Sequence, residues 1–200
     1  MTDKAGTVGI EVLTQAHDYL REVVAGVGDG QWGSATPCAG WTARQVLNHA
    51  RIDQQGYGLA LTGGRPDGDP FHPADTLDGD PAAELDKVLT MVAEAYAALP
   101  ADTEEAPTPL GPLPLRIALG AAAMDAAVHA WDIAVATGQD RPLPVGTAEG
   151  IRPAADRLVN HLRDVYQVFA PAGEPAPDHD PAQALLAFLG RDPHWTAVAH

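Results

Sequence analysis

The sequence predicts an all-α protein, a four-helix bundle with connections of unequal length and a short C-terminal helix. Apolar residues recur at helical spacing in several long segments of the chain. Connections rich in proline, glycine and aspartate separate these segments. No segment shows a convincing alternation of apolar and polar residues with a period of two, which is the pattern of a half-buried strand.

The first two helices have clear boundaries. The first is expected over residues 7–25, and it ends at the glycine-rich segment 26–30. The second has the clearest start in the chain, because Thr42 and Gln45 form the sequence pattern of a capping box. We expect this helix to continue to about residue 61, where a pair of glycines stops it.

A polar connection, residues 65–81, leads to a third helix over residues 82–99, which carries apolar residues at helical spacing. The next connection, residues 100–114, is rich in proline, and it is too long and too apolar for a simple linker. It is expected to contain short strands or to cover a pocket. The fourth helix follows over residues 115–137 and is rich in alanine.

The C-terminal part contains a fifth helix over residues 147–169 and a short terminal helix over residues 181–189. Residues 171–200 are otherwise expected to form a partly extended tail. A length of 200 residues is typical of one domain with a real core, so we expect residues 1–200 to form a single domain.

Composition excludes several classes of partner. The formal charge of −15 and a pI near 4.6 argue against nucleic acid and against anionic membranes. No early segment is apolar enough for a signal peptide, and no run approaches the ~20 apolar residues of a membrane span. The single cysteine excludes an intramolecular disulfide and fits a reducing cytoplasm.

A candidate metal site lies on the fourth helix. Asp125, His129 and Asp132 are spaced i, i+4 and i+7, so they share one stripe of the helix with several alanines. Buried carboxylates and imidazoles need a partner or a metal, and a carboxylate one turn from a neutral imidazole supplies half of a divalent-metal site. His49 on the second helix is the best candidate for a third ligand, because bundles build metal sites between facing helices.

Simpler interpretations remain open for each of these residues. His49 would also fit a hydrogen-bonded core histidine, and Asp125 with His129 would fit an i, i+4 hydrogen bond. Asp132 and Asp53 each lie about one turn beyond a histidine, where they would orient an imidazole as acceptors behind the metal ligands. Pairing with an arginine on the helix surface would also explain them, and for Asp53 it is the preferred explanation.

Other polar residues have weaker functional signals. Arg44 and Arg51 flank His49 and would contact an anionic cofactor or substrate, although surface ion pairs explain them more simply. Cys38 precedes the second helix, whose N-terminus would stabilise a thiolate, but a small buried hydrophobic residue is the preferred role. Trp41 and Trp131 are expected to be packing residues, Trp41 as part of a hydrophobic staple.

Three segments together resemble one family. The sequence from Thr36 to His49, TPCAGWTARQVLNH, resembles the opening of actinobacterial DinB-like metal-binding proteins, which are related to the N-terminal domain of mycothiol-dependent maleylpyruvate isomerase. The pattern Asp125-x-x-x-His129-x-Trp131-Asp132 and the closing sequence LLAFLGRDP also resemble that family, in the same order.

The resemblance implies a DinB-like four-helix bundle and one divalent metal, zinc or nickel, held by His49, Asp125 and His129. The isomerase has glutamate at the acid position and many relatives have histidine, so the shorter Asp125 puts the metal's identity and affinity in question. The isomerase also has a further C-terminal domain for which this chain ends too early, so maleylpyruvate isomerisation is not carried over.

Three hypotheses for function follow. Three ligands leave a metal position open, which is typical of a catalytic site. The resemblance favours a cytoplasmic transferase or isomerase that uses a low-molecular-weight thiol such as mycothiol on a small electrophilic molecule. The alternatives are a metal-dependent hydrolase that uses metal-bound hydroxide and a non-catalytic metal-binding or stress protein. A homodimer is possible, but no residues in the sequence identify its interface.

Overall fold

The computed structural model describes residues 4–76, 78–174 and 176–197. Its elements follow the predicted order, with a 3₁₀ turn added after the first helix and a β-hairpin in the connection before the fourth bundle helix. They are α1 (Lys4–Ala25), η1 (Asp29–Gln31), α2 (Ala43–Ala60), α3 (Pro81–Ala97), β1 (Glu105–Thr108), β2 (Gly111–Pro114), α4 (Leu115–Ala136), α5 (Val145–His161), η2 (Leu162–Tyr166) and α6 (Pro181–Phe188).

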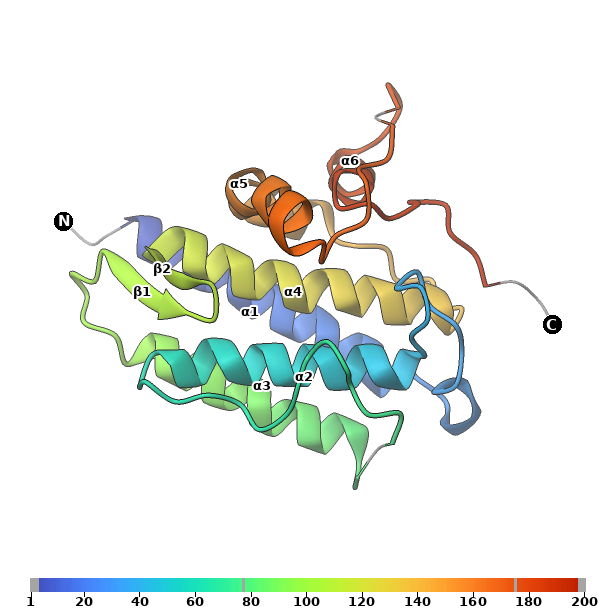
Figure 1. The fold of residues 1–200 in the computed structure, drawn as a ribbon, viewed down its shortest axis with the longest axis horizontal. Coiled ribbons are helices and arrows are strands. Elements are labelled where there is room, and N and C mark those ends of the chain that lie inside the picture. Colours follow the sequence, from blue (N-terminus) through green and yellow to red (C-terminus); the bar gives the residue numbers. More distant parts are fainter. Residues whose placement is uncertain (1–3, 77, 175, 198–200) are drawn as a thin grey trace.

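Four helices form the bundle. α1 packs against α4 and α3, and α2 packs against the same two helices, so each bundle helix has two neighbours (Figure 1). α5 lies across the outside of α4 and α1, and α6 packs on α5. The prediction of an all-α four-helix bundle with a short C-terminal helix is confirmed.

The capping box at the start of α2 is also confirmed. Thr42 is the N-cap residue, and its side chain accepts a hydrogen bond from the backbone N–H of Gln45. The side chain of Gln45 accepts in return from the backbone N–H of Thr42. This reciprocal pair fixes where the helix begins, and it thereby fixes the position of His49 two turns along α2.

The predicted end of the fifth helix at residue 169 is wrong. α5 ends at His161, a short π-helical turn follows, and Gln167 adopts a left-handed backbone conformation with φ of 57°. Val165 is 59% exposed and Tyr166 is 62% exposed, so these two residues, which follow His161 closely, bury no face against the bundle. Without that burial, helical spacing alone does not maintain the helix.

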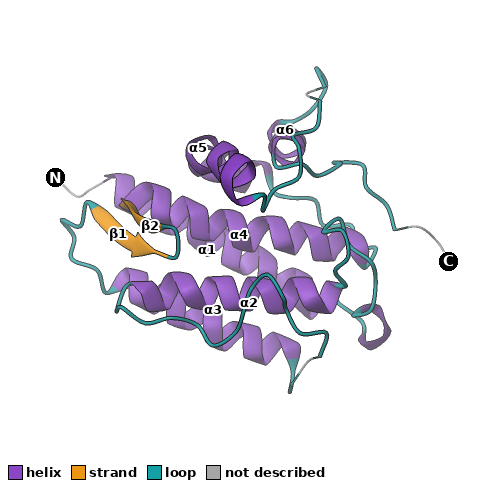
Figure 2. Cartoon of the chain, viewed as in Figure 1, coloured by secondary structure: helices purple, strands orange, loops and turns teal. Residues whose placement is uncertain are grey.

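The proline-rich connection before α4 does contain short strands. β1 and β2 pair as an antiparallel hairpin in which Thr108 lies opposite Gly111 (Figure 2). Gly111 has a φ of +96°, a conformation that favours glycine, and its carbonyl accepts a hydrogen bond of 2.7 Å from the Thr108 hydroxyl. β1 contacts both α2 and α4, so the hairpin packs on the two helices that carry the candidate site.

α4 is the central helix of the core. The sequence predicted one buried stripe, but α1, α2 and α5 all pack against α4, and they bury it on almost every side. The expectation that no run approaches a membrane span is wrong for Leu115–Ala136, which is long and apolar enough by length and mean hydropathy. Since 89% of that window is buried inside the protein, the core position of α4 explains its apolar composition.

Candidate metal centre

Three side chains from two bundle helices direct their donor atoms toward one another. His49 comes from α2, and Asp125 and His129 come from successive turns of α4. The Oδ1 atom of Asp125 lies 3.9 Å from Nε2 of His49 and 3.6 Å from Nε2 of His129. One donor atom of each residue lies within 4.8 Å of the other two. The structure therefore brings together the three residues that the sequence grouped as ligands.

The contacts within this triad are too long to be hydrogen bonds, which join nitrogen and oxygen at about 2.7–3.2 Å. The simple i, i+4 hydrogen bond considered between Asp125 and His129 is therefore not formed at 3.6 Å. The three side chains are only 10–11% exposed, so their facing atoms are largely shielded from solvent.

The far side of each imidazole is occupied. Nδ1 of His49 lies 2.8 Å from the carbonyl oxygen of Pro70, and Nδ1 of His129 lies 2.9 Å from Oδ2 of Asp132. A carbonyl and a carboxylate only accept hydrogen bonds, so both Nδ1 atoms must donate. In the neutral ring, Nε2 then keeps its lone pair, and both lone pairs face Asp125.

Asp53 does not lie behind His49, where it would act as an orienting acceptor, one of the two roles considered for it. Its Oδ2 atom lies 3.5 Å from Nε2 of His49, on the ligand side of the ring and close to Asp125. Among the described residues Asp53 has no ion pair with an arginine, the other explanation considered. At 33% side-chain exposure, Asp53 is the most accessible carboxylate of the cluster.

Asp125 is held from its other side by Gln54, whose Nε2 donates to Oδ2 of Asp125 at 2.8 Å. Burial raises the pKa of the Asp125 carboxyl well above its ordinary value, and the neighbouring Asp53 raises it further. Without a cation, the site therefore favours a protonated Asp125, and a metal that bound there would displace this proton.

His129 belongs to a buried network that extends to the C-terminal segment. Arg191 donates to Oδ2 of Asp132 at 3.1 Å, and Cys38 Sγ lies 3.1 Å from the same oxygen. Burial would raise the pKa of Asp132, but the charge of Arg191 and the hydrogen bond from His129 lower it below its usual range. Burial lowers the pKa of His129 to about 4, so its ring is neutral near pH 7.

Cys38 is not an activated thiol in this network. Burial and then the charge of Asp132 raise the pKa of the thiol, and the opposing effect of Arg191 is smaller. The expected stabilisation of a thiolate near the N-terminus of α2 is therefore outweighed. The sulfur also forms a second candidate ligand group with His129 and Asp132. Arg191 already supplies the cation there, at 3.5 Å from Sγ.

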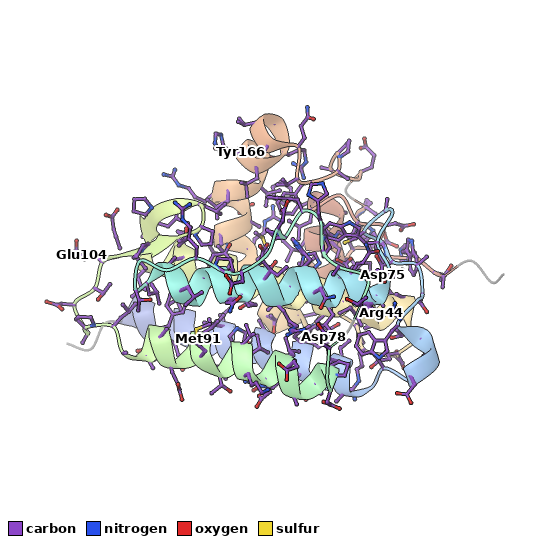
Figure 3. All side chains as sticks on the ribbon, turned by 60° about the horizontal axis from the view of Figure 1, so that its bottom comes forward. Arg44, Asp75, Asp78, Met91, Glu104 and Tyr166 are labelled. Atoms are coloured by element: carbon purple, nitrogen blue, oxygen red, sulfur yellow. The ribbon has the colours of Figure 1, made fainter. Side chains whose placement is uncertain are left out.

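The two arginines that flank His49 do not point into the triad. Arg44 pairs with the Asp75 carboxylate at 3.1 Å, and both side chains are visible at the surface in Figure 3. Arg51 lies 3.4 Å from the Asn48 side-chain oxygen and lines a cavity of about 660 Å³ between α2, the following connection and α3. Among the described residues, the lining of this cavity includes none of the three triad residues.

The connection that follows α2 folds back over the helix and is tied to it by side-chain donors. Asn48 Nδ2 donates to the carbonyl oxygens of Ala74 and Thr76, at 2.7 and 2.8 Å. Gln45 Nε2 donates to the carbonyl of Pro73. These bonds hold the connection where the Pro70 carbonyl can accept from His49.

The two tryptophans have different environments. Trp131 is buried in the core, as expected for a packing residue. The rings of Trp41 and His49 have centroids 4.9 Å apart and are tilted by 49°, so Trp41 packs against the candidate ligand. Its contact therefore extends beyond the hydrophobic staple that the sequence suggested.

The residues present fit a divalent metal. Ligand atoms at 2.0–2.2 Å from one ion lie roughly 3.4 Å apart at tetrahedral angles, close to the 3.6 and 3.9 Å observed. Two imidazoles with fixed far sides and one carboxylate are a donor set for zinc, nickel or a similar ion. Three protein ligands leave room for a small molecule.

Sequence reasoning missed four contributors to the site: His17, Gln54, the Pro70 carbonyl and Arg191. A signal existed for His17, because it lies on the apolar face of α1 between Ala16 and Leu20. A signal also existed for Arg191, because a buried Asp132 needs a cation. For Pro70 no local signal exists, because the path of a connection is set by tertiary contacts.

Comparisons with known proteins agree with the fold. Residues 13–134, which include all three triad residues, match the mycothiol maleylpyruvate isomerase N-terminal domain family. Uncharacterized protein Rv0738 and Uncharacterized protein MT0763, both of Mycobacterium tuberculosis, are each 32% identical to this chain over 179 residues. The matched region covers 88% of this chain and 94% of each relative.

Solved structures show the same fold at low identity. The crystal structure of the mycothiol-dependent maleylpyruvate isomerase gives a TM-score of 0.53 at 16% identity, and the match covers 74% of this chain and 66% of that chain. A point mutant of the isomerase gives a TM-score of 0.54 at 15% identity, with 82% and 72% covered. This chain therefore spans about two thirds of the solved isomerase, and the likeness concerns the fold.

Proposed function

The chain belongs to the mycothiol maleylpyruvate isomerase N-terminal domain family, and we propose that it is a divalent-metal-dependent member that uses a low-molecular-weight thiol. The reaction would be the transfer or isomerisation of a small electrophilic molecule. Zinc or nickel would be held by His49, Asp125 and His129. The protein would act in the cytoplasm, without nucleic acid or a membrane as partner.

One observation carries the metal part of this proposal. Two imidazole nitrogens that keep their lone pairs lie 3.6 and 3.9 Å from the same carboxylate oxygen, with no hydrogen bond between them. In a buried site this arrangement leaves three acceptors facing one another, which is unfavourable unless a proton or a cation lies between them. A divalent cation satisfies all three acceptors at once.

The thiol part is supported by the solved structural neighbour, a mycothiol-dependent isomerase, and by the state of Cys38. Because burial and Asp132 raise the pKa of Cys38, the chain's own thiol is a poor nucleophile at neutral pH. A thiol reaction at this site therefore needs a thiol from a second molecule. A bound divalent metal would supply the positive charge that lowers the pKa of such a thiol.

The chain's residues have separate tasks in this proposal. Asp132 and the Pro70 carbonyl orient the two imidazoles through their Nδ1 atoms. Asp53, the accessible carboxylate beside His49, marks the side from which a small molecule reaches the triad. The Asp53 carboxylate can accept a hydrogen bond from a donor group of that small molecule.

A thiol titration tests the proposal. Zinc-loaded protein is titrated calorimetrically with mycothiol, and S-methyl mycothiol serves as a control that cannot ionise. We expect saturable binding of mycothiol with proton release, much weaker binding of the S-methyl compound, and loss of thiol binding in His129→Gln. His161→Gln, an exposed histidine outside the site, is the matched control and should bind as the wild type does.

Other outcomes would point to the alternatives. Turnover of activated ester substrates that does not need a thiol would indicate a metal-dependent hydrolase. Stoichiometric metal with no thiol binding and no turnover would indicate a non-catalytic metal-binding protein.

A further inference from the structure

A buried chain of hydrogen bonds runs from α1 through α2 to the triad. His17 on α1 is 1% exposed and Gln54 on α2 is 0% exposed, so both polar side chains occupy core positions. Nε2 of His17 lies 2.9 Å from Oε1 of Gln54, and Nε2 of Gln54 lies 2.8 Å from Oδ2 of Asp125. Gln54 Nε2 also donates to the carbonyl of Ala122 at 2.8 Å.

The direction of every bond in this chain is determined. The Gln54 amide nitrogen has two acceptors, the Asp125 carboxylate and the Ala122 carbonyl, so its oxygen must face His17. His17 must then donate from Nε2. The opposite amide orientation would place the Gln54 oxygen against the Ala122 carbonyl oxygen, which can only accept. A donating His17 therefore supports the one orientation that lets Gln54 donate to Asp125.

The consequence for Asp125 is that its two oxygens are no longer equivalent. Rotation about the terminal bond of an aspartate side chain is soft, so an unrestrained carboxylate samples many orientations. Oδ2 accepts from Gln54, and Oδ1 is left facing Nε2 of both histidines. An oriented ligand loses less freedom when it binds a metal than an unrestrained one does.

We propose that His17 and Gln54 are positioning residues that select Oδ1 of Asp125 as the metal ligand and thereby set the metal affinity of the site. This inference rests on the proposed function, because it needs a metal at the triad. It adds α1 as a third helix to a site whose ligands come from α2 and α4 only.

A purely structural role makes a different prediction. If the chain only stabilised the core, its removal would lower the stability of the protein and leave the affinity of the folded protein for metal unchanged. Gln139 provides the matched comparison. Its amide also joins a position after α4 to α1, by donating to the Val23 carbonyl at 3.0 Å, but it has no hydrogen bond to a triad residue.

The experiment measures Zn²⁺ affinity by competition with a chromophoric chelator, beside the melting temperature of each metal-free protein. Gln54→Leu should bind Zn²⁺ 10–100-fold more weakly than the wild type, the usual effect of losing a group that orients a ligand. His17→Leu should weaken binding less, and the double variant should be no weaker than Gln54→Leu, because both act through one bond. Gln139→Leu should keep wild-type affinity.

A second variant guards against a folding defect. Gln54→Asn keeps the amide but is one methylene shorter and cannot span the same distance, so it should also weaken binding. Wild-type affinity in folded Gln54→Leu or Gln54→Asn would overturn the inference. If the His129→Gln variant loses Zn²⁺ while those variants keep it, the proposed function stands and only the positioning role fails. Failure of the wild type to bind Zn²⁺ would overturn both.

Discussion

Replacing Arg191 with leucine tests the buried network behind His129. Arg191 donates to Oδ2 of Asp132 at 3.1 Å, and the Asp132 side chain is 0% exposed. Arg191→Leu keeps an apolar side chain in contact with the core but leaves the carboxylate with one neutral imidazole and one thiol as its remaining partners. The charge of Asp132 is then buried without a counter-charge.

The expected loss of stability is large. Removing one partner of a buried ion pair costs about 3–5 kcal/mol, because the remaining charge is uncompensated. For a protein of this size, 1 kcal/mol changes the melting temperature by roughly 2–4 °C, so a decrease of roughly 6–20 °C is expected. Arg141→Leu removes an exposed ion pair with Glu22 and should cost no more than about 1 kcal/mol.

Urea unfolding of metal-free protein at pH 7 measures the loss. Adding Asp132→Asn to Arg191→Leu removes the stranded charge, so the double variant should be more stable than Arg191→Leu alone. The difference should also shrink as the pH is lowered from 7, because burial without Arg191 raises the pKa of Asp132 and the single variant can then take up a proton there. A loss below 1 kcal/mol in Arg191→Leu, or no rescue by Asp132→Asn, would refute the assignment of Arg191 as the counter-charge.

Three further outcomes are expected. Chelation should lower the melting temperature by an amount set by metal affinity. It should leave helical circular dichroism at 25 °C intact, because the bundle has its own core. Loss of the helical signal would instead indicate a structural metal. Burial lowers the pKa of His17 from 6.5 to about 4, so its neutral form stabilises the fold above pH 6.5, and this contribution is lost as the pH falls toward 4. Between pH 6.5 and pH 4, the free energy of unfolding of His17→Leu should therefore fall by about 3 kcal/mol less than that of the wild type, as measured by urea unfolding. Parallel pH profiles of the two proteins would contradict this. Burial and Asp132 raise the pKa of Cys38, so a disulfide reagent should react with it at pH 8 much more slowly in folded than in urea-unfolded protein; equal rates would contradict the raised pKa.

Local signals account for the features that the sequence predicted well. The capping box of Thr42 and Gln45 spans four residues, so it fixes the start of α2 without tertiary information. Asp125, His129 and Asp132 lie on one helix, where spacing alone determines that their side chains are neighbours. His49 joined this group through the expectation of facing helices and through the family resemblance.

Long-range contacts account for what the sequence missed. Gln54 and Asp125 are 71 positions apart, and Arg191 and Asp132 are 59 apart, so no spacing rule connects them. An acceptor behind His49 was one of the two roles considered for Asp53, but the Pro70 carbonyl occupies that position. The path of the connection from α2 to α3 depends on bonds such as that of Asn48 to Ala74, which only the folded structure reveals.

Several expectations stay predictions. They are the single domain over residues 1–200, the homodimer, and metal binding by His49, Asp125 and His129 with Asp132 and Asp53 around them. Analytical ultracentrifugation of the wild type would test the dimer independently of the site.

The metal content of His129→Gln beside that of the wild type tests the central claim most directly. Both proteins are purified without an affinity tag, incubated with one equivalent of Zn²⁺ or Ni²⁺, separated from free metal and analysed by elemental mass spectrometry. Glutamine keeps polarity and much of the volume of histidine but is a poor ligand for either ion. We expect about one metal ion per wild-type chain and almost none in a folded, helical His129→Gln variant. Equal metal content in the two proteins would contradict the assignment of the site.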